Sequence, residues 1–244
     1  MKRRRRVALY GGTFDPVHVG HLTVARGLLK LFALDEVLFV PAYHAPHKRE
    51  RRVSPAHERY AMLALATQGE ERLRVSAVEM TAPERPYTVE TLSSFLERAG
   101  GSTRLFFVMG ADSWEEITTW REWEKVLTLT DQIVVTRPRY ELPTAHVTEE
   151  IRRRVVDIRG RTREEVESEL EKSLENSEEP RVFLTDAAKV DASATAVREA
   201  VGRGEFGKLD ALVVPAVAEY IKKYGLYRGA DRTEFSDAGN KETH

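Results

Sequence analysis

Short apolar runs recur along the chain, and stretches with helical periodicity separate them. The runs at 7–10, 36–40, 105–109, 132–136 and 181–185 each hold four or five residues, which suits buried strands. Between the first two, six apolar residues fall on one broad face of a helix: Leu22, Val24, Ala25, Leu28, Leu29 and Phe32. This order of strand, helix and strand predicts a right-handed crossover in an α/β fold with a parallel sheet.

Less distinctive patterns predict the remaining strand and helices. The alternating pattern of 74–80 predicts another strand, and Ser54 followed by Pro55 predicts the start of a helix that ends near 67. Thr88 is in position to cap a further helix. Pro215 begins the last helix, and Gly225 ends it in a left-handed cap.

The segment 139–180 differs in composition from the rest of the chain. It is highly charged, and Thr162 with Glu165 forms a capping box before a helix that has only one narrow apolar line. It is interpreted as a peripheral helical insertion at about 144–180. The predicted organisation is one domain over 1–228, followed by a disordered tail over 229–244.

Composition narrows the range of functions. The 38 basic and 39 acidic side chains of the 244 residues give a net charge of −1, so no overall field favours nucleic acid. The absence of cysteine excludes disulfides, thiolate catalysis and cysteine-bound zinc. No stretch is long enough to span a bilayer, so a cytoplasmic protein is expected. The basic run 2–6 is interpreted as a solvated lead-in to the first strand, in preference to an RNA-binding arm.

The stretch Val7–His21, VALYGGTFDPVHVGH, carries the most distinctive candidate chemistry. It predicts a strand, a glycine turn and a helix start, where backbone N–H groups and the helix dipole favour an anion. His18 and His21, spaced H-x-G-H, can donate hydrogen bonds to phosphoryl oxygens, and Gly20 leaves room for a nucleotide. Taken singly, a glycine turn is common and a histidine at a helix start is more often a cap.

Other candidates lie after later strands. The basic loop 42–53 contains Lys48 and follows a strand, at the sheet edge where open α/β proteins bind ligands. Asp112 follows the 105–109 strand and could meet a ribose hydroxyl or a metal, or simply cap a helix. Trp120, in a turn between helices, could present its ring to a flat ligand. A second phosphate site, or an ordinary capped helix, is indicated by Ser193, Thr195 and Arg198.

Several blocks together resemble one family. They are GGTFDPVHVGHL (11–22), PAYHAPHK (41–48), RPYTVETL (85–92), MGADSWEEITTWREWEKVL (109–127), TRP (136–138), SATAVRE (193–199) and YIKKYGLYR (220–228). Over 7–228 the chain resembles the bacterial nicotinate-nucleotide adenylyltransferases of the H-x-G-H nucleotidylyltransferase superfamily. It departs from them at Ala42, where family members often have Asn, and in the length of the 144–180 stretch.

The resemblance implies a Rossmann-like nucleotidylyltransferase fold, mostly parallel, with helices on both faces of the sheet. It also implies adenylyl transfer from ATP to nicotinate mononucleotide, giving deamido-NAD and pyrophosphate in NAD biosynthesis. Mg²⁺ would arrive with ATP, and no protein metal ligand is expected. The phosphate of the mononucleotide is already a nucleophile, so catalysis needs positioning and charge stabilisation.

Residue roles follow from the same resemblance. The catalytic set would be His18, His21, Lys48 and Arg198. The ATP-binding set would be the Gly11, Gly12, Thr13 and Phe14 backbone, Gly110 and Asp112 at the ribose, and Ser193 and Thr195 at the departing phosphates. The mononucleotide-binding set would be Thr88, Trp120 and Arg137.

Alternatives remain open at this point. The acceptor could be nicotinamide mononucleotide or, less compatibly with the PYT and TTW blocks, phosphopantetheine. The chain could also be a non-catalytic nucleotide-binding module. The expected partners are ATP and nicotinate mononucleotide, with no nucleic acid and no membrane, and a homo-oligomer stays open.

Overall fold

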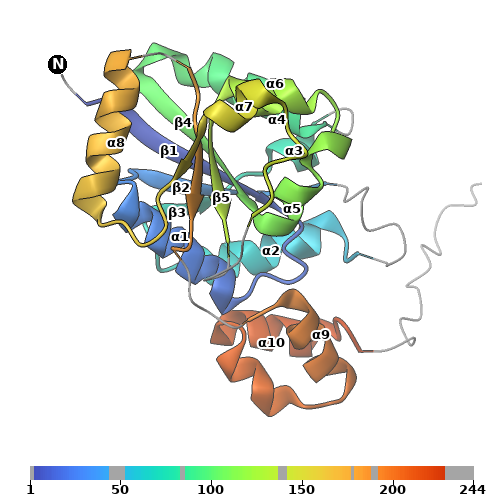
Figure 1. The fold of residues 1–244 in the computed structure, drawn as a ribbon. Coiled ribbons are helices and arrows are strands. Elements are labelled where there is room, and N and C mark those ends of the chain that lie inside the picture. Colours follow the sequence, from blue (N-terminus) through green and yellow to red (C-terminus); the bar gives the residue numbers. More distant parts are fainter. Residues whose placement is uncertain are drawn as a thin grey trace, which may run out of the picture.

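The computed structural model describes residues 3–43, 53–82, 86–136, 142–176, 179–187 and 192–228 (Figure 1). Within these residues seven strands form one sheet in which every neighbouring pair is parallel. The spatial order is β3-β2-β1-β4-β5-β7-β6. The strands are β1 Arg5–Gly12, β2 Glu36–Pro41, β3 Leu73–Val75, β4 Thr103–Gly110, β5 Asp131–Val135, β6 Val155–Asp157 and β7 Val182–Thr185.

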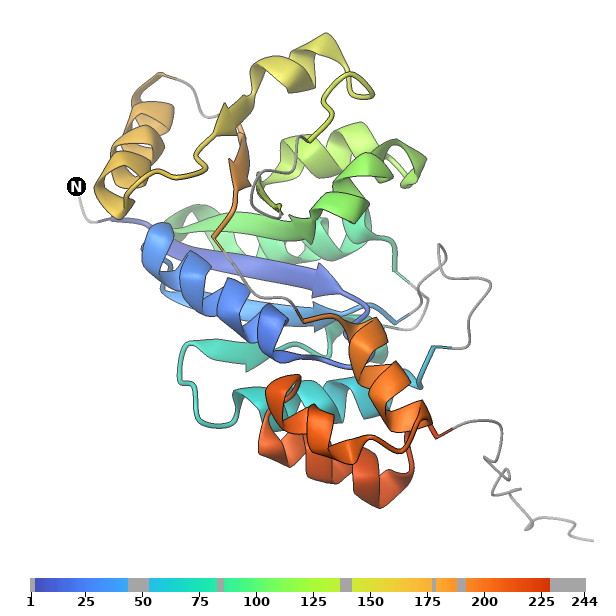
Figure 2. The ribbon, with the colours of Figure 1, turned by 60° about the horizontal axis from the view of Figure 1, so that its bottom comes forward.

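Helices cover both faces of this sheet (Figure 2). The α-helices are α1 Val19–Leu31, α2 Ala56–Thr67, α3 Val78–Thr81, α4 Thr88–Ala99, α5 Ala111–Glu115, α6 Trp123–Leu129, α7 Glu149–Arg153, α8 Arg163–Asn176, α9 Ala194–Gly202 and α10 Pro215–Tyr224. The 3₁₀ helices are η2 Gly100–Ser102, η3 Ile117–Thr119 and η4 Phe206–Ala211.

Two hydrophobic clusters lie on opposite faces because side chains alternate along each strand. From β1, Ala8 and Tyr10 join the cluster that contains residues of α1, α2, α8, α9 and α10. Val7 and Leu9 join the other, which contains residues of α4, α5, α6 and α7. The predicted α/β architecture with a parallel sheet and helices on both faces is confirmed.

The strand order reverses at β1. The chain moves outward from β1 through β2 to β3, then returns to the other side of β1 as β4 and continues to β5. In open parallel sheets this reversal opens a crevice at the carboxyl ends of the two central strands. Gly11 and Gly12 end β1, and Gly110 ends β4, so these glycines border the crevice.

The strands predicted from apolar runs are confirmed, with β1 extending through both glycines. The strand predicted for 74–80 is wrong beyond Val75, because the chain turns there and forms α3. Glu79 of α3 accepts hydrogen bonds from the Tyr43 N–H (3.1 Å) and the Thr91 hydroxyl (3.0 Å). These partners are distant in sequence, so the local alternation carries no sign of them.

The 144–180 stretch contains α8, the helix expected after the Thr162–Glu165 capping box, and both hydrogen bonds of that box are present; it also contains α7, which was not predicted. It also supplies β6, an edge strand beside β7 that sequence reasoning missed. The predicted tail 229–244 lies outside the described residues.

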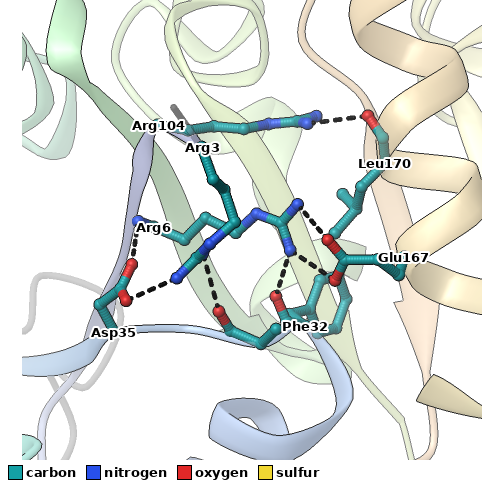
Figure 3. Close-up of polar contacts among 8 residues, drawn as sticks. Arg3, Arg6, Phe32, Asp35, Arg104, Glu167 and Leu170 are labelled. Carbon is teal, nitrogen blue, oxygen red and sulfur yellow. Dashed lines mark hydrogen bonds and ion pairs between the residues drawn. The ribbon is translucent and has the colours of Figure 1, made fainter. Parts of the chain in front are cut away.

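The basic run at the start of the chain is only partly a solvated lead-in. Arg6 is 3% exposed and donates two hydrogen bonds to the Glu167 carboxylate of α8, each 2.7 Å, and one to the Phe32 carbonyl (Figure 3). Arg3 pairs with Asp35 in the same network. The prediction was wrong for Arg6 because its acidic partner is supplied by a distant helix. This ion pair fixes α8 against the amino-terminal edge of the sheet.

The last helices gather below the carboxyl edge of the sheet in Figure 1. Their lobe joins the rest through the Val19 N–H to Leu212 carbonyl bond (2.9 Å) and the Tyr220 hydroxyl to Glu58 bond (2.7 Å). Pro215 begins α10 and Gly225 ends it with φ 61°, as predicted. None of the helices in the described ranges has the length and apolarity needed to cross a bilayer.

Candidate active site

A cavity of about 710 Å³ opens at the carboxyl ends of β1 and β4, where the strand order reverses. Its size is that of a small-molecule site. Ten of the residues singled out from the sequence line it: Gly11, Gly12, Thr13, Phe14, His21, Thr88, Gly110, Asp112, Trp120 and Arg198. Residues separated by nearly the whole chain therefore meet at one edge of the sheet.

The remaining candidates fall into two groups. His18, Ser193 and Thr195 do not line the cavity. Ser193 and Thr195 flank Ala194, which does, and His18 packs against His21, which also does. Lys48 and Arg137 lie outside the described residues.

The glycines at the end of β1 admit aromatic rings from two sides. A Cβ on Gly11 would lie 2.8 Å from the Phe107 ring, and one on Gly12 would lie 2.9 Å from the Phe14 ring. Phe14 itself has φ 50°, in the left-handed region. Such a turn lets main-chain N–H groups gather around an anion. The anion-binding turn predicted from GGTF is thus compatible with the observed backbone.

The two histidine rings pack against each other, with centroids 3.7 Å apart and planes tilted by 30°. The His18 main-chain N–H donates to Nδ1 of His21 (3.2 Å), so the neutral His21 ring carries its proton on Nε2. His21 lines the cavity and can donate that proton to a phosphoryl oxygen. His18 is buried, and burial, assisted by the Arg198 charge, lowers its pKa to about 4. His18 is therefore neutral at pH 7, and its ring packs against the His21 ring.

Gly20 leaves space for the ring of His18. A Cβ at position 20 would lie 2.9 Å from Nδ1 and Cε1 of His18. The space beside Gly20 was expected to accommodate a nucleotide, but the His18 ring fills it. Gly20 therefore allows the His18 ring to lie in this position.

Arg198 brings a fixed positive charge to the cavity from α9. It donates to the Asp15 carbonyl (2.7 Å) and to the Thr195 hydroxyl (2.8 Å). Ser193 caps α9 by accepting the Ala196 N–H (3.1 Å). The capped-helix interpretation therefore holds for Ser193, and Thr195 orients the guanidinium.

Residues of β4, α4, α5 and the segment after η3 also line the cavity. A Cβ on Gly110 would lie 2.7 Å from the Asp112 carboxylate, so the glycine permits that carboxylate's position. Trp120 packs edge-on against Phe107, with ring centroids 6.4 Å apart. Thr88 is the first residue of α4 and Tyr87 occupies the cap position, so the capping role predicted for Thr88 is wrong, while its place at the cavity agrees with the ligand-facing role.

Four charged residues that line the cavity were not assigned a role from the sequence: Asp15, Glu79, Glu116 and Arg121. Burial raises the pKa of Glu79 above its ordinary range. Arg121 lies over the Tyr87 ring, 4.6 Å from its centroid. Arg121 directly follows Trp120, and that position could have identified it. Glu79 fell within a wrongly predicted strand and carried no such signal.

The cavity is thus lined by the glycine turn after β1, a histidine that can donate an N–H, an arginine, and the aromatic side chains Phe107 and Trp120. With the reversal in strand order, these features define a nucleotide-binding α/β protein of the nucleotidylyltransferase class. The cytidylyltransferase-like family model matches residues 9–200. The chain belongs to this family and, within it, to the nicotinate-nucleotide adenylyltransferases.

Curated relatives and solved structures support that placement. The chain is 34% identical over 226 residues to a probable nicotinate-nucleotide adenylyltransferase of Desulfatibacillum aliphaticivorans, covering 91% of this chain and 99% of the relative. It is 34% identical over 234 residues to the one of Corynebacterium glutamicum, covering 95% and 94%. The fold resembles Plasmodium falciparum nicotinic acid mononucleotide adenylyltransferase complexed with NaAD, with TM-score 0.65, 18% identity and coverage of 91% and 97%.

Proposed function

We propose that the chain transfers the adenylyl group of ATP to nicotinate mononucleotide, forming deamido-NAD and pyrophosphate. The observation that carries this proposal is that His21 of the H-x-G-H turn and Arg198 line one cavity, which Thr88 and Trp120 also line. The relatives that are 34% identical over nearly their whole length are named nicotinate-nucleotide adenylyltransferases, which supports nicotinate mononucleotide as the acceptor.

The reaction requires two anions to be brought together. A phosphate oxygen of the mononucleotide attacks the α-phosphorus of ATP, and the bond from that phosphorus to the bridging oxygen of the β-phosphate breaks. Pyrophosphate leaves with the bonding electrons. No side-chain nucleophile is needed, so the protein contributes alignment and stabilisation of charge.

The residues that line the cavity can be given roles in that scheme. The N–H groups of the Gly11–Phe14 turn and Nε2–H of His21 would hold the ATP phosphates, with His21 at the α-phosphate. Arg198 would stabilise charge on the departing pyrophosphate. Asp112, at the end of β4, would accept from the adenosine ribose, and Thr88 and Trp120 would face the pyridine nucleotide. Lys48 and Arg137 keep the roles expected from the family resemblance.

A divalent metal fits this scheme as a companion of ATP. Within the described ranges, no three His, Asp or Glu side chains gather into a metal-binding group. Mg²⁺ is commonly held by substrate phosphates, water and one or two carboxylates, and Asp15 and Asp112 are cavity carboxylates beside or among the residues proposed to hold ATP. When bound, the ion would supply charge neutralisation on the triphosphate. Use of Mg²⁺, a cytoplasmic location and a homo-oligomer all remain predictions.

An isotope experiment tests the chemistry directly. The mononucleotide is labelled with ¹⁸O in its phosphate and incubated with ATP, Mg²⁺ and the protein, and the products are analysed by mass spectrometry. The mechanism predicts that all the label stays in the dinucleotide and that the pyrophosphate is unlabelled. Label in the pyrophosphate, or no dinucleotide at all, would contradict the proposed function.

A further inference from the structure

Arg59 is a buried charge that the mechanism above does not use. It lies in the first turn of α2 and is only 2% exposed. Its guanidinium donates to three main-chain carbonyls: Thr13 at 2.7 Å, Ser54 at 2.9 Å and Tyr43 at 3.3 Å. One side chain therefore joins the turn after β1 to residues from two other segments of the chain.

Burying a guanidinium at this position costs desolvation free energy that an apolar side chain would not. Burial lowers the pKa of Arg59, and the nearby carboxylates of Asp15 and Glu79 offset part of that effect. Arginine nevertheless stays charged in proteins. An apolar side chain could fill similar volume without this desolvation penalty, so the three carbonyl bonds are the feature that distinguishes arginine here.

The geometry of the peptide bond connects Arg59 to the anion-binding turn. Thr13 and Phe14 line the cavity, whereas Arg59 does not. The Thr13–Phe14 peptide is trans, so its C=O and N–H point in opposite directions. Arg59 binds the Thr13 carbonyl and does not line the cavity, so the Phe14 N–H of the same peptide points away from Arg59. Phe14 has φ 50°, a conformation that needs such external support.

Tyr43 is fixed by the same group. Its carbonyl accepts from Arg59, and its N–H donates to Glu79 at 3.1 Å. The Ser54 N–H in turn donates to the Asp15 carboxylate at 3.3 Å. The carbonyls that Arg59 binds therefore belong to residues whose own main chain is tied to the cavity, which makes the guanidinium the centre of one connected frame.

We infer that Arg59 is a positioning residue for ATP: it orients the Phe14 N–H toward the phosphates by holding the Thr13 carbonyl. The role assigned to the turn rests on the proposed function. Arg59 itself touches no substrate. Its loss should therefore weaken ATP binding while leaving the sheet and the second substrate's wall intact.

The test compares two buried arginines. Arg59→Lys keeps the charge but removes the planar fork, and Arg6→Lys makes the same change at a residue that is 3% exposed at the opposite edge of the sheet. For both variants, steady-state kinetics give KM and kcat for each substrate, calorimetry gives the ATP affinity, and thermal unfolding gives stability. We expect Arg59→Lys to weaken ATP binding and raise the KM for ATP roughly 10- to 100-fold, less than the loss of an entire oxyanion donor costs in some enzymes. Arg6→Lys should leave both within about twofold.

A purely structural role predicts a different pattern. Both variants would lose stability and active fraction together, with the KM for ATP and the ATP affinity unchanged, and that result would overturn the inference. Calorimetry needs no turnover. If wild type binds ATP but makes no dinucleotide, the proposed function fails, while the comparison of ATP affinities still decides the role of Arg59.

A second measurement covers the case in which Arg59→Lys does not fold. Wild-type protein is labelled with ¹⁵N-phenylalanine, and the Phe14 amide signal is assigned by its disappearance in Phe14→Tyr. Adding inorganic tripolyphosphate should shift this signal strongly. If tripolyphosphate binds and the Phe14 signal does not move, the inferred orientation of its N–H is wrong.

Discussion

Lowering the pH from 7 to 5 should destabilise the protein through His18. The folded-state pKa of His18 is about 4, against an ordinary value of 6.5, because burial and the Arg198 charge disfavour the protonated ring. In the unfolded chain the ring takes up a proton near its ordinary pKa. Stability from this group is therefore complete well above pH 6.5 and is lost progressively as the pH falls toward 4.

The size of the effect follows from the two pKa values. The full difference corresponds to roughly 3 kcal/mol, and about 2 kcal/mol of it is lost between pH 7 and pH 5. Urea unfolding at both pH values measures the loss for wild type and for His18→Asn, which cannot titrate. Carboxylates that titrate in this range are common to both proteins, so the difference between the two losses isolates His18.

The control is His57→Asn, which removes a histidine whose side chain is 74% exposed. It should retain the wild-type pH dependence, because this substitution leaves the buried His18 ring in place. If His18→Asn loses as much stability as wild type on acidification, His18 is not held neutral by burial. A protonated His18 would then add a second positive charge near Arg198.

Three other substitutions test separate parts of the structure. His21→Ala should lower kcat about 10²- to 10³-fold with a much smaller change in ATP affinity, and equal losses in both would contradict a transition-state role. Trp120→Ala should raise the KM for the mononucleotide and leave that for ATP nearly unchanged; a selective rise for ATP would place the ring at the wrong substrate. Glu167→Ala should cost roughly 2–3 kcal/mol of unfolding free energy, because it leaves buried Arg6 without its carboxylate, and substrate KM values should not move. A stability change below about 0.5 kcal/mol would show that the ion pair contributes little.

The parts of the fold and site that could be predicted are those encoded locally. The β1–turn–α1 unit follows from an apolar run, two glycines and a helical stripe, and all of its signals lie within 25 residues or so. Arg198 was recognised because its helix start carries small hydroxylated residues. The cavity then follows from topology, since parallel strands bring their carboxyl ends to one edge.

The parts that could not be predicted depend on partners distant in sequence. Arg59 appeared as an ordinary helix residue, because none of its bonded carbonyls has a side-chain signature. Arg6 lies 161 residues from Glu167, so a basic run near the start of the chain gave no indication of a buried ion pair. β6 is an edge strand of three residues, too short to stand out within a charged segment. In each case tertiary contacts override the local pattern.

The identity of the acceptor is tested most directly by pyrophosphate release with ATP and Mg²⁺, measured in parallel with nicotinate mononucleotide and nicotinamide mononucleotide. The two acceptors differ by one small group, carboxylate against amide, on the pyridine ring that is proposed to bind beside Thr88 and Trp120. The account predicts a kcat/KM at least tenfold higher for the acid. Equal or reversed values would contradict it and direct attention to Ala42, and absence of release with both acceptors would contradict adenylyl transfer itself.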